Sequence, residues 1–200
     1  MDAWVYVAIG IGAYLWGSLS PALIISDRIG KKDVRKYGSG NAGTTNMMRT
    51  FGWKFGLMTF VLDVIKGVAA ALIGRWVGGQ IGMSVAAVLV IVGHNWPVYY
   101  GFKGGKGIAS TLGVMFVLMP VQTAVLLPVV ILIMALTRYV SVGSMLGVIL
   151  ESICVFIFYP GETLLQVIFC REPMITPCMT VDDVLPCIVK MLRTSLQSKT

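Results

Sequence analysis

Long apolar runs separated by short polar segments make up most of the chain up to about residue 158. A helix needs ~20 apolar residues to cross a hydrocarbon core, and several of the runs approach or exceed this length. Pro120 interrupts the longest run, which predicts two short spans joined at the proline. We therefore predict an all-α integral membrane protein, a multi-span helical bundle of about six spans. The expected spans lie at residues 4–26, 55–76, 81–92, 108–136 (two spans) and 140–158, and we expect a tight turn at Gly78-Gly79-Gln80 between the second and the third.

Composition and charge place these spans in a membrane. The chain is 56% apolar and 12% charged, and its mean hydropathy is +0.83. No basic segment precedes the first run, so we expect a permanent span and not a cleaved signal. The polar segments 27–54 and 94–107 and the turn at Arg138 carry basic residues, which predicts that they face the cytoplasm and that the N-terminus lies outside. Because topology alone explains the net charge of +7, we expect a lipid bilayer and no nucleic acid as partner.

The first polar loop holds a dense set of hydrogen-bonding side chains. Residues 38–49 read GSGNAGTTNMMR, with one Ser, two Thr and two Asn ahead of a single Arg. These side chains can donate hydrogen bonds, and the guanidinium of Arg49 can bind a phosphate through two of them. The alternative is a glycine-rich turn whose Asn and Thr side chains cap the next helix. The density of donors favours an anion site.

The second polar loop combines glycines with lysines. Residues 93–107 read GHNWPVYYGFKGGKG and include His94, the only histidine of the chain. Glycines let backbone N–H groups approach an anion, and lysines supply point charges for phosphate. The loop is not a nucleotide-binding P-loop, because Lys106 is followed by Gly107 and not by Ser or Thr. A basic interfacial loop without a site is the alternative, and His94 could be a general base, a phosphate donor or a structural hydrogen-bonding group.

The remaining polar residues limit the possible chemistry. Asp63 and Lys66 lie three residues apart within the second run, so they can pair inside the membrane. One histidine and few, scattered acids make a nucleophilic triad and a covalent acyl-enzyme implausible. Direct transfer between two bound substrates fits better. The cysteine spacings match no zinc site, and we expect no metal and no cofactor.

Four segments occur in an order that resembles a known family. GSGNAGTTNMMR, LDVIKG, GHNWPVYYGFKGGKG and RYVSVGS resemble the bacterial acyl-phosphate:glycerol-3-phosphate acyltransferases over about residues 10–150. The resemblance implies transfer of a fatty acyl group from acyl phosphate to glycerol 3-phosphate, which yields lysophosphatidic acid and phosphate in phospholipid synthesis. It also implies a protein of the bacterial inner membrane with seven spans, an outward N-terminus, a cytoplasmic active site and no cofactor. We expect the chain to be a monomer.

The same resemblance assigns site residues. Ser39, Arg49 and Lys106 match the catalytic positions of the family motifs. The substrate-binding positions are expected at Gly38, Asn41, Thr45, Asn46, His94, Lys103, Gly104, Gly105, Gly107 and Ser144.

The end of the chain departs from the family pattern. Residues 1–150 form the predicted acyltransferase domain, whereas residues 151–200 hold all four cysteines and lack the family's third motif, which is rich in His and Arg. An altered gene end would explain this change. Two alternatives remain. The first is an inactive remnant of the enzyme. The second is a transporter of an anionic metabolite, which the intramembrane charges favour and the absence of an inverted repeat in the sequence disfavours.

Overall fold

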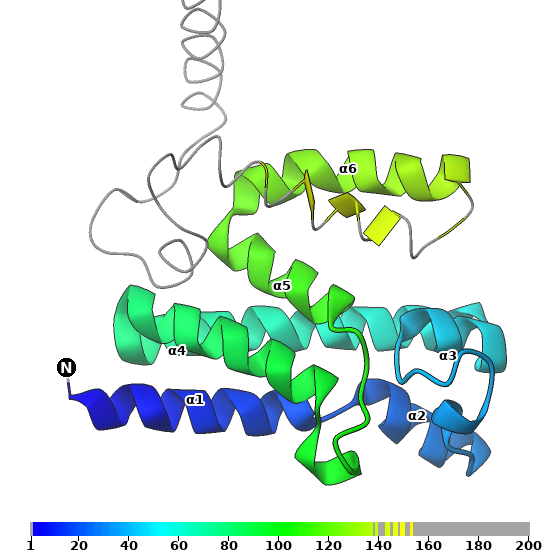
Figure 1. Ribbon diagram of the computed structural model, residues 1–200, viewed down its shortest axis with the longest axis horizontal. Coiled ribbons are helices and arrows are strands. Elements are labelled where there is room, and N and C mark those ends of the chain that lie inside the picture. Colours follow the sequence, from blue (N-terminus) through cyan, green and yellow to red (C-terminus); the bar gives the residue numbers. More distant parts are fainter. Residues whose placement is uncertain are drawn as a thin grey trace, which may run out of the picture. The chain divides into compact units, whose positions relative to one another are not determined.

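A computed structural model describes residues 2–137 and, beyond them, residues 139, 143, 144, 146, 147, 149, 150 and 153. Every element in this part of the chain is a helix, as the sequence predicted (Figure 1). The sixth expected span, 140–158, lies largely outside the described residues, and the segment 151–200 lies outside them except for Ile153. The elements are α1 (Ala3–Ser18), α2 (Pro21–Gly30), η1 (Val34–Lys36), α3 (Thr44–Phe51), α4 (Trp53–Asn95), η2 (Val98–Tyr100), α5 (Ile108–Leu118) and α6 (Pro120–Thr137).

Within the described residues, three apolar segments are long enough to cross a membrane: Ala3–Ile29, Trp53–Tyr100 and Pro120–Thr137. The shorter helix α5 is also apolar. The predicted break at Pro120 is confirmed, because α5 ends at Leu118 and α6 starts at the proline. Proline fixes φ and has no N–H to donate, so it fits the first turn of a new helix and disrupts a continuing one.

The first expected span, 4–26, is not one continuous helix. The backbone is extended at Leu19 and Ser20, and α2 begins at Pro21. Because the proline cannot donate a hydrogen bond, the carbonyl of Gly17 loses its helical partner and needs another donor. Hydropathy stays high across this break, so the pattern of apolar residues does not reveal it.

Residues 53–95 form two helical segments joined at a glycine. Gly79 has φ 62° and ψ −150°, a conformation that only glycine adopts readily, so the predicted turn at 78–80 is confirmed. The chain folds back there, and Gly74 contacts the carbonyl of Gly82 across the turn. The second and third expected spans are the two arms of this hairpin.

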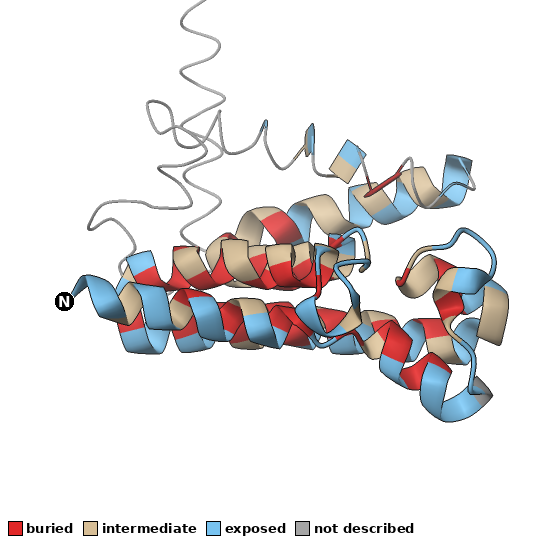
Figure 2. Cartoon of the chain, turned by 60° about the horizontal axis from the view of Figure 1, so that its bottom comes forward, coloured by how far each residue is buried: buried red, intermediate tan, exposed pale blue. Residues whose placement is uncertain are grey.

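Small residues let the helices approach closely. Gly17 of α1 lies against the carbonyl of Val90 in α4, and Gly113 of α5 lies against the carbonyl of Val64. Association of helices in a membrane depends on this close packing, because lipid tails are as apolar as side chains. Figure 2 shows the consequence: buried residues line the faces where α1 and α4 meet, and intermediate or exposed residues cover the other faces.

Two glycines of α1 provide a matched test of this packing. A Cβ at Gly17 would overlap the Val90 carbonyl, whereas a Cβ at Gly12 meets nothing within 4 Å. We expect Gly17→Ala to lower the free energy of unfolding by about 1–3 kcal/mol, the usual cost of overpacking. Gly12→Ala should be neutral or slightly stabilising. Thermal unfolding in detergent measures both, and equal midpoints for the two variants would contradict the packing role of Gly17.

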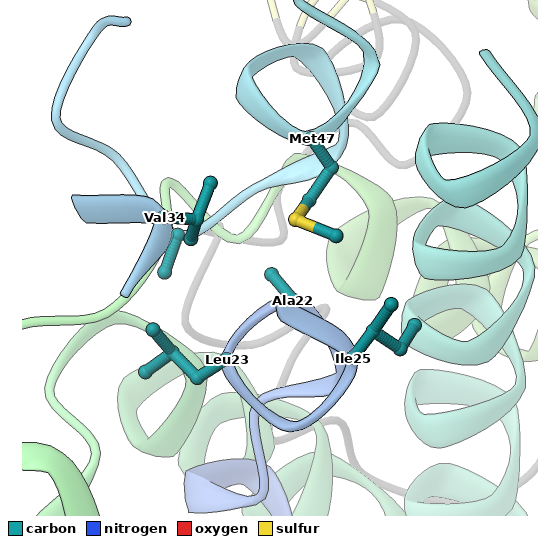
Figure 3. Packing of buried hydrophobic residues seen from close by; sticks show 6 residues of the cluster. Ala22, Leu23, Ile25, Val34 and Met47 are labelled. Atoms are coloured by element: carbon teal, nitrogen blue, oxygen red, sulfur yellow. The ribbon is translucent and has the colours of Figure 1, made fainter. Parts of the chain in front are cut away.

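A small apolar cluster fixes the first polar loop against α2. Its members come from α2, η1, the loop and α3, and Met47 and Val34 are fully buried in it (Figure 3). The cluster packs together residues that are distant in sequence, so the loop is held at both ends. Its members are Ala22, Leu23, Ile25, Val34, Ala42 and Met47.

Candidate active site

Both polar loops contribute to one cavity of ≈ 230 Å³. The first loop and α3 form one wall, the second loop and the start of α5 form another, and α4, α6 and residue 144 complete it. The lining residues are Ser39, Asn41, Gly43, Thr44, Thr45, Asn46, Arg49, Phe60, Asp63, His94, Lys106, Gly107, Ile108, Ala109, Met134 and Ser144.

The charges in this cavity suit an anion. Arg49 and Lys106 line it, and neither forms an ion pair with any described residue. The single carboxylate in the lining, Asp63, is paired with Lys66. The described wall therefore presents two uncompensated positive charges, as a phosphate site requires.

Asn46 shapes the first loop. Its Oδ1 accepts a hydrogen bond from the backbone N–H of Ser39 at 2.9 Å, and its Nδ2 donates to the carbonyls of Val34, Tyr37 and Asn41, each at 3.0 Å. The side chain is 1% exposed. The sequence prediction gave Asn46 a substrate-binding role, but these bonds occupy its amide. It therefore holds Ser39 in place, and its direct contact with substrate stays an untested prediction.

The glycines of the second loop serve close packing. The amide of Gly104 donates to the carbonyl of Asn95 at 3.2 Å, and that of Gly105 donates to the carbonyl of His94 at 3.1 Å. A Cβ at Gly105 would collide with Nε2 of His94. These two amides are thus engaged within the chain, and their expected role in holding phosphate stays a prediction.

Arg35 joins the two polar loops. Its Nη1 donates to the carbonyls of Tyr100 at 2.8 Å and Lys103 at 3.0 Å, while Nη2 lies 2.7 Å from Oδ2 of Asp33. The guanidinium thus bridges η1 and the turn that precedes Lys106. The sequence analysis did not single out this residue, because its acceptors are backbone carbonyls more than sixty positions away.

The Arg35 bridge makes a pH-dependent contribution to stability. The hydrogen bond from the Arg35 guanidinium lowers the pKa of Asp33 below its ordinary value of 3.8. A carboxylate with a depressed folded-state pKa stabilises the fold above its unfolded pKa, and this stabilisation is lost as pH falls through the folded pKa.

We expect the unfolding midpoint of Asp33→Asn to lie below that of the native protein at pH 6. The difference should shrink steadily below about pH 4, where Asp33 becomes protonated in both the folded and the unfolded states. Thermal unfolding of the two proteins over pH 3–6 measures this. A difference that stays constant across the range would show that the Asp33 charge contributes nothing.

Three ionisable side chains meet at the cavity wall, and two of them, Asp63 and His94, line the cavity. Oδ1 of Asp63 lies 3.1 Å from Nζ of Lys66 and 3.2 Å from Nδ1 of His94. All three residues are at most 4% exposed. The predicted pairing of Asp63 with Lys66 is confirmed, and its connection to His94 is a feature that spacing did not reveal. Nζ of Lys66 also donates to the carbonyls of Gly17 at 3.1 Å and Leu19 at 2.9 Å. It thus supplies hydrogen-bond donors to the backbone carbonyls at the break between α1 and α2.

Most of the sequence-predicted site residues line the cavity. This holds for Ser39, Asn41, Thr45, Asn46, Arg49, His94, Lys106, Gly107 and Ser144. Four others do not: Gly38, Lys103, Gly104 and Gly105. The lining also contains apolar residues that the sequence analysis did not select, namely Phe60, Ile108, Ala109 and Met134. Nothing in their local sequence separates them from lipid-facing residues.

The comparisons with known proteins identify the family. A family model described as "Glycerol-3-phosphate acyltransferase" matches residues 7–181, most of the chain. The chain belongs to the glycerol-3-phosphate acyltransferase family. The resemblance seen in the motifs is thereby confirmed, and the transporter alternative has no support.

Individual members of the family are similar to this chain. The glycerol-3-phosphate acyltransferase of Clostridioides difficile (strain 630) is 45% identical over 154 residues, which are 74% of this chain and 76% of the relative. That of Thermoanaerobacter pseudethanolicus (strain ATCC 33223 / 39E) is 45% identical over 141 residues, 70% of this chain and 71% of the relative. The chain thus covers more than two thirds of both relatives.

Solved structures of the family share the fold. The crystal structure of PlsY (YgiH), an integral membrane glycerol 3-phosphate acyltransferase, in its glycerol 3-phosphate form is 36% identical, with a TM-score of 0.75 and coverage of 82% of each chain. The lysophosphatidic acid form is 35% identical, with a TM-score of 0.72 and the same coverage. This chain is therefore an all-helical integral membrane protein of the same fold.

The family match reaches into the divergent end of the chain. It ends at residue 181, whereas the two relatives align over 154 and 141 residues, close to the extent of the motif resemblance. The proposed division at residue 150 and the altered gene end concern residues outside the described part of the chain, and both stay predictions.

Proposed function

We propose that this chain transfers a fatty acyl group from acyl phosphate to glycerol 3-phosphate, a step in phospholipid synthesis. Membership of the acyltransferase family supports the reaction. We assign the site to the cavity because its lining combines two cations, Arg49 and Lys106, with two hydroxyl groups, those of Ser39 and Ser144. Both substrates carry a phosphate, and the site offers cations and hydroxyl groups to hold it.

The cavity has a polar and an apolar side. Ser39, Arg49 and Lys106 are the residues to which we assign catalysis, and they come from the two polar loops. The first turn of α3 also lines the cavity, and the N–H groups of a helix N-terminus favour an anion. Phe60 and Met134 supply an apolar surface on which the first carbons of an acyl chain can lie. This arrangement suits a molecule that is both phosphorylated and apolar.

The reaction needs no covalent intermediate with the protein. A hydroxyl oxygen of glycerol 3-phosphate attacks the acyl carbonyl carbon and forms the ester bond. The bond between that carbon and the phosphate oxygen then breaks. Phosphate leaves and takes up the hydroxyl proton, so atoms and charge balance without another reactant. Arg49 and Lys106 stabilise the negative charge that grows on the leaving phosphate.

Positive-inside counting supports the orientation of the protein. Both polar loops that form the cavity are rich in basic residues, which favours a cytoplasmic site, an N-terminus on the outer side and about six spans. We propose that the enzyme belongs to the inner membrane of a bacterium. We also propose that it acts as a monomer.

Phosphate release by the purified protein tests the function. The protein in detergent or lipid receives palmitoyl phosphate and glycerol 3-phosphate, and release that requires both substrates is expected. Release without glycerol 3-phosphate would indicate hydrolysis and contradict the transfer. If a folded protein releases no phosphate until a family-type C-terminus is attached, the chain is an inactive remnant of the enzyme.

A further inference from the structure

His94 is the only histidine of the chain, and its ring lies at the junction of α4, α5 and the second polar loop. Its Nδ1 faces the buried charges: Nζ of Lys66 is 3.0 Å away, Oδ1 of Asp63 is 3.2 Å away and Oγ of Ser110 is 3.4 Å away. Its Nε2 faces Gly105, where a Cβ would collide with it. The two ring nitrogens therefore have different surroundings, and the position of the proton decides what the ring can do.

The N–H groups of Lys66 determine which ring nitrogen of His94 carries the proton. An ammonium group has three N–H bonds and no acceptor. Nζ of Lys66 has three hydrogen-bond partners: the carbonyl of Gly17 at 3.1 Å, the carbonyl of Leu19 at 2.9 Å and Nδ1 of His94 at 3.0 Å. The two carbonyls can only accept. The third N–H is therefore left for Nδ1, which must then carry a lone pair.

Asp63 provides charge and not a competing hydrogen bond. Its Oδ1 is within ion-pair distance of Lys66 and His94, yet it has no hydrogen-bond partner of acceptable angle. A carboxylate at 3.1 Å compensates the buried ammonium by Coulomb attraction. This attraction favours the charged form of Lys66 and leaves the N–H that points to the imidazole available.

We infer that Lys66 holds His94 as the neutral tautomer with its proton on Nε2, so that His94 serves the cavity as an N–H donor and not as a proton acceptor. The Nε2–H then lies against Gly105, whose Cβ position also borders the carbonyl oxygen of Ala42 in the first polar loop. Of the three roles that the sequence left open for His94, general base is excluded. Given the proposed function, the hydroxyl proton passes to the leaving phosphate.

Nitrogen NMR reads the tautomer directly. Protein labelled with ¹⁵N-histidine gives signals from one imidazole only, because the chain has no other histidine. The two nitrogens are told apart by their couplings to the ring protons. We expect Nε2 to show the shift of a protonated nitrogen and Nδ1 that of an unprotonated one, near neutral pH and without substrate. A proton on Nδ1, or on both nitrogens, would overturn the inference whether or not the protein is active.

Lys66→Met tests the cause of the tautomer. Without the ammonium, Nδ1 is 3.2 Å from the Asp63 carboxylate, so the proton should move to Nδ1 in a large part of the molecules. Lys54→Met is the control, since Lys54 lies on the same helix outside the cavity and should leave the spectrum unchanged. An unchanged spectrum in Lys66→Met would contradict the role of Lys66. If that variant does not fold, the spectrum of the native protein still decides.

Two isosteres test the role of the donor. The amide of Gln can place an N–H near the position of Nε2, whereas the shorter Asn places its amide near that of Nδ1. We expect His94→Gln to keep kcat/KM within about tenfold of the native value and His94→Asn to lose about tenfold more, the usual worth of one hydrogen bond to a charged group. Equal losses in both variants would contradict a donor role for Nε2.

Discussion

Lys106→Ala should lower kcat/KM for the two substrates at least about tenfold, and up to about a hundredfold. The ammonium lines the cavity and pairs with no described carboxylate, so it is available to a phosphate. A hydrogen bond to a charged group contributes about 1.5–3 kcal/mol, and 1.4 kcal/mol corresponds to about a factor of ten in rate. Membrane insertion and the unfolding midpoint should stay close to those of the native protein. Phosphate release over a range of both substrate concentrations measures the effect.

Lys103→Ala is the matched control for Lys106. Lys103 belongs to the same loop, but its side chain is absent from the cavity lining, and its carbonyl accepts a bond from Arg35 whatever the side chain is. We expect a loss of less than about threefold, as for a screened surface charge. If kcat/KM fell more in Lys103→Ala than in Lys106→Ala, Lys103 would be the main phosphate-binding lysine. The prediction from the motif that Lys103 binds substrate would then hold.

Asn46→Ala should have the largest effect on the structure of the site. The change removes the acceptor for the Ser39 N–H and the donor for three carbonyls in a nearly fully buried position. Each buried polar group left without a partner costs about 1–3 kcal/mol, so we expect the free energy of unfolding to fall by about 2–4 kcal/mol. Because Ser39 loses its support, transfer activity of the folded fraction should fall at least about tenfold.

Asn41→Ala is the control that shows whether the effect is specific to the Asn46 side chain, which holds Ser39, or follows from the loss of any side-chain amide in the loop. Only the backbone carbonyl of Asn41 bonds to Asn46, so the substitution leaves the network of Asn46 intact. We expect the unfolding midpoint of Asn41→Ala to match that of the native protein, with any effect confined to KM. Asn46→Ala protein with a native midpoint would show that the four hydrogen bonds are not needed to hold the loop.

The architecture and the position of the site followed from local patterns. Apolar runs of membrane length, Pro120 and the glycines at 78–80 act through hydropathy and backbone geometry, which are local properties, and the breaks at Pro120 and Gly79 were found where they were expected. The two polar loops were recognised because donors, cations and glycines are rare in a membrane protein. The break at Pro21 was overlooked because Leu19 and Ser20 do not interrupt the hydropathy of the run.

Assignment of roles within the loops required the tertiary structure. The motifs mark Asn46, Lys103 and Lys106 as site residues but do not show which of them reach the cavity. Only the fold shows that Asn46 supports Ser39, that Lys103 is absent from the cavity lining and that Lys106 belongs to it. Arg35 and the apolar wall at Phe60 and Met134 depend on contacts between residues far apart in the chain, which no local pattern encodes.

The sequence by itself predicted a helical membrane protein, showed the resemblance to the glycerol-3-phosphate acyltransferases and predicted the site in two polar loops. These properties depend on composition, spacing and motif order. The tertiary structure decided which side chains reach the cavity and which hold the loops together. It also surrounded His94 with Asp63 and Lys66, because hydrogen-bond partners and buried charges are set by the distances between helices and not by positions along the chain.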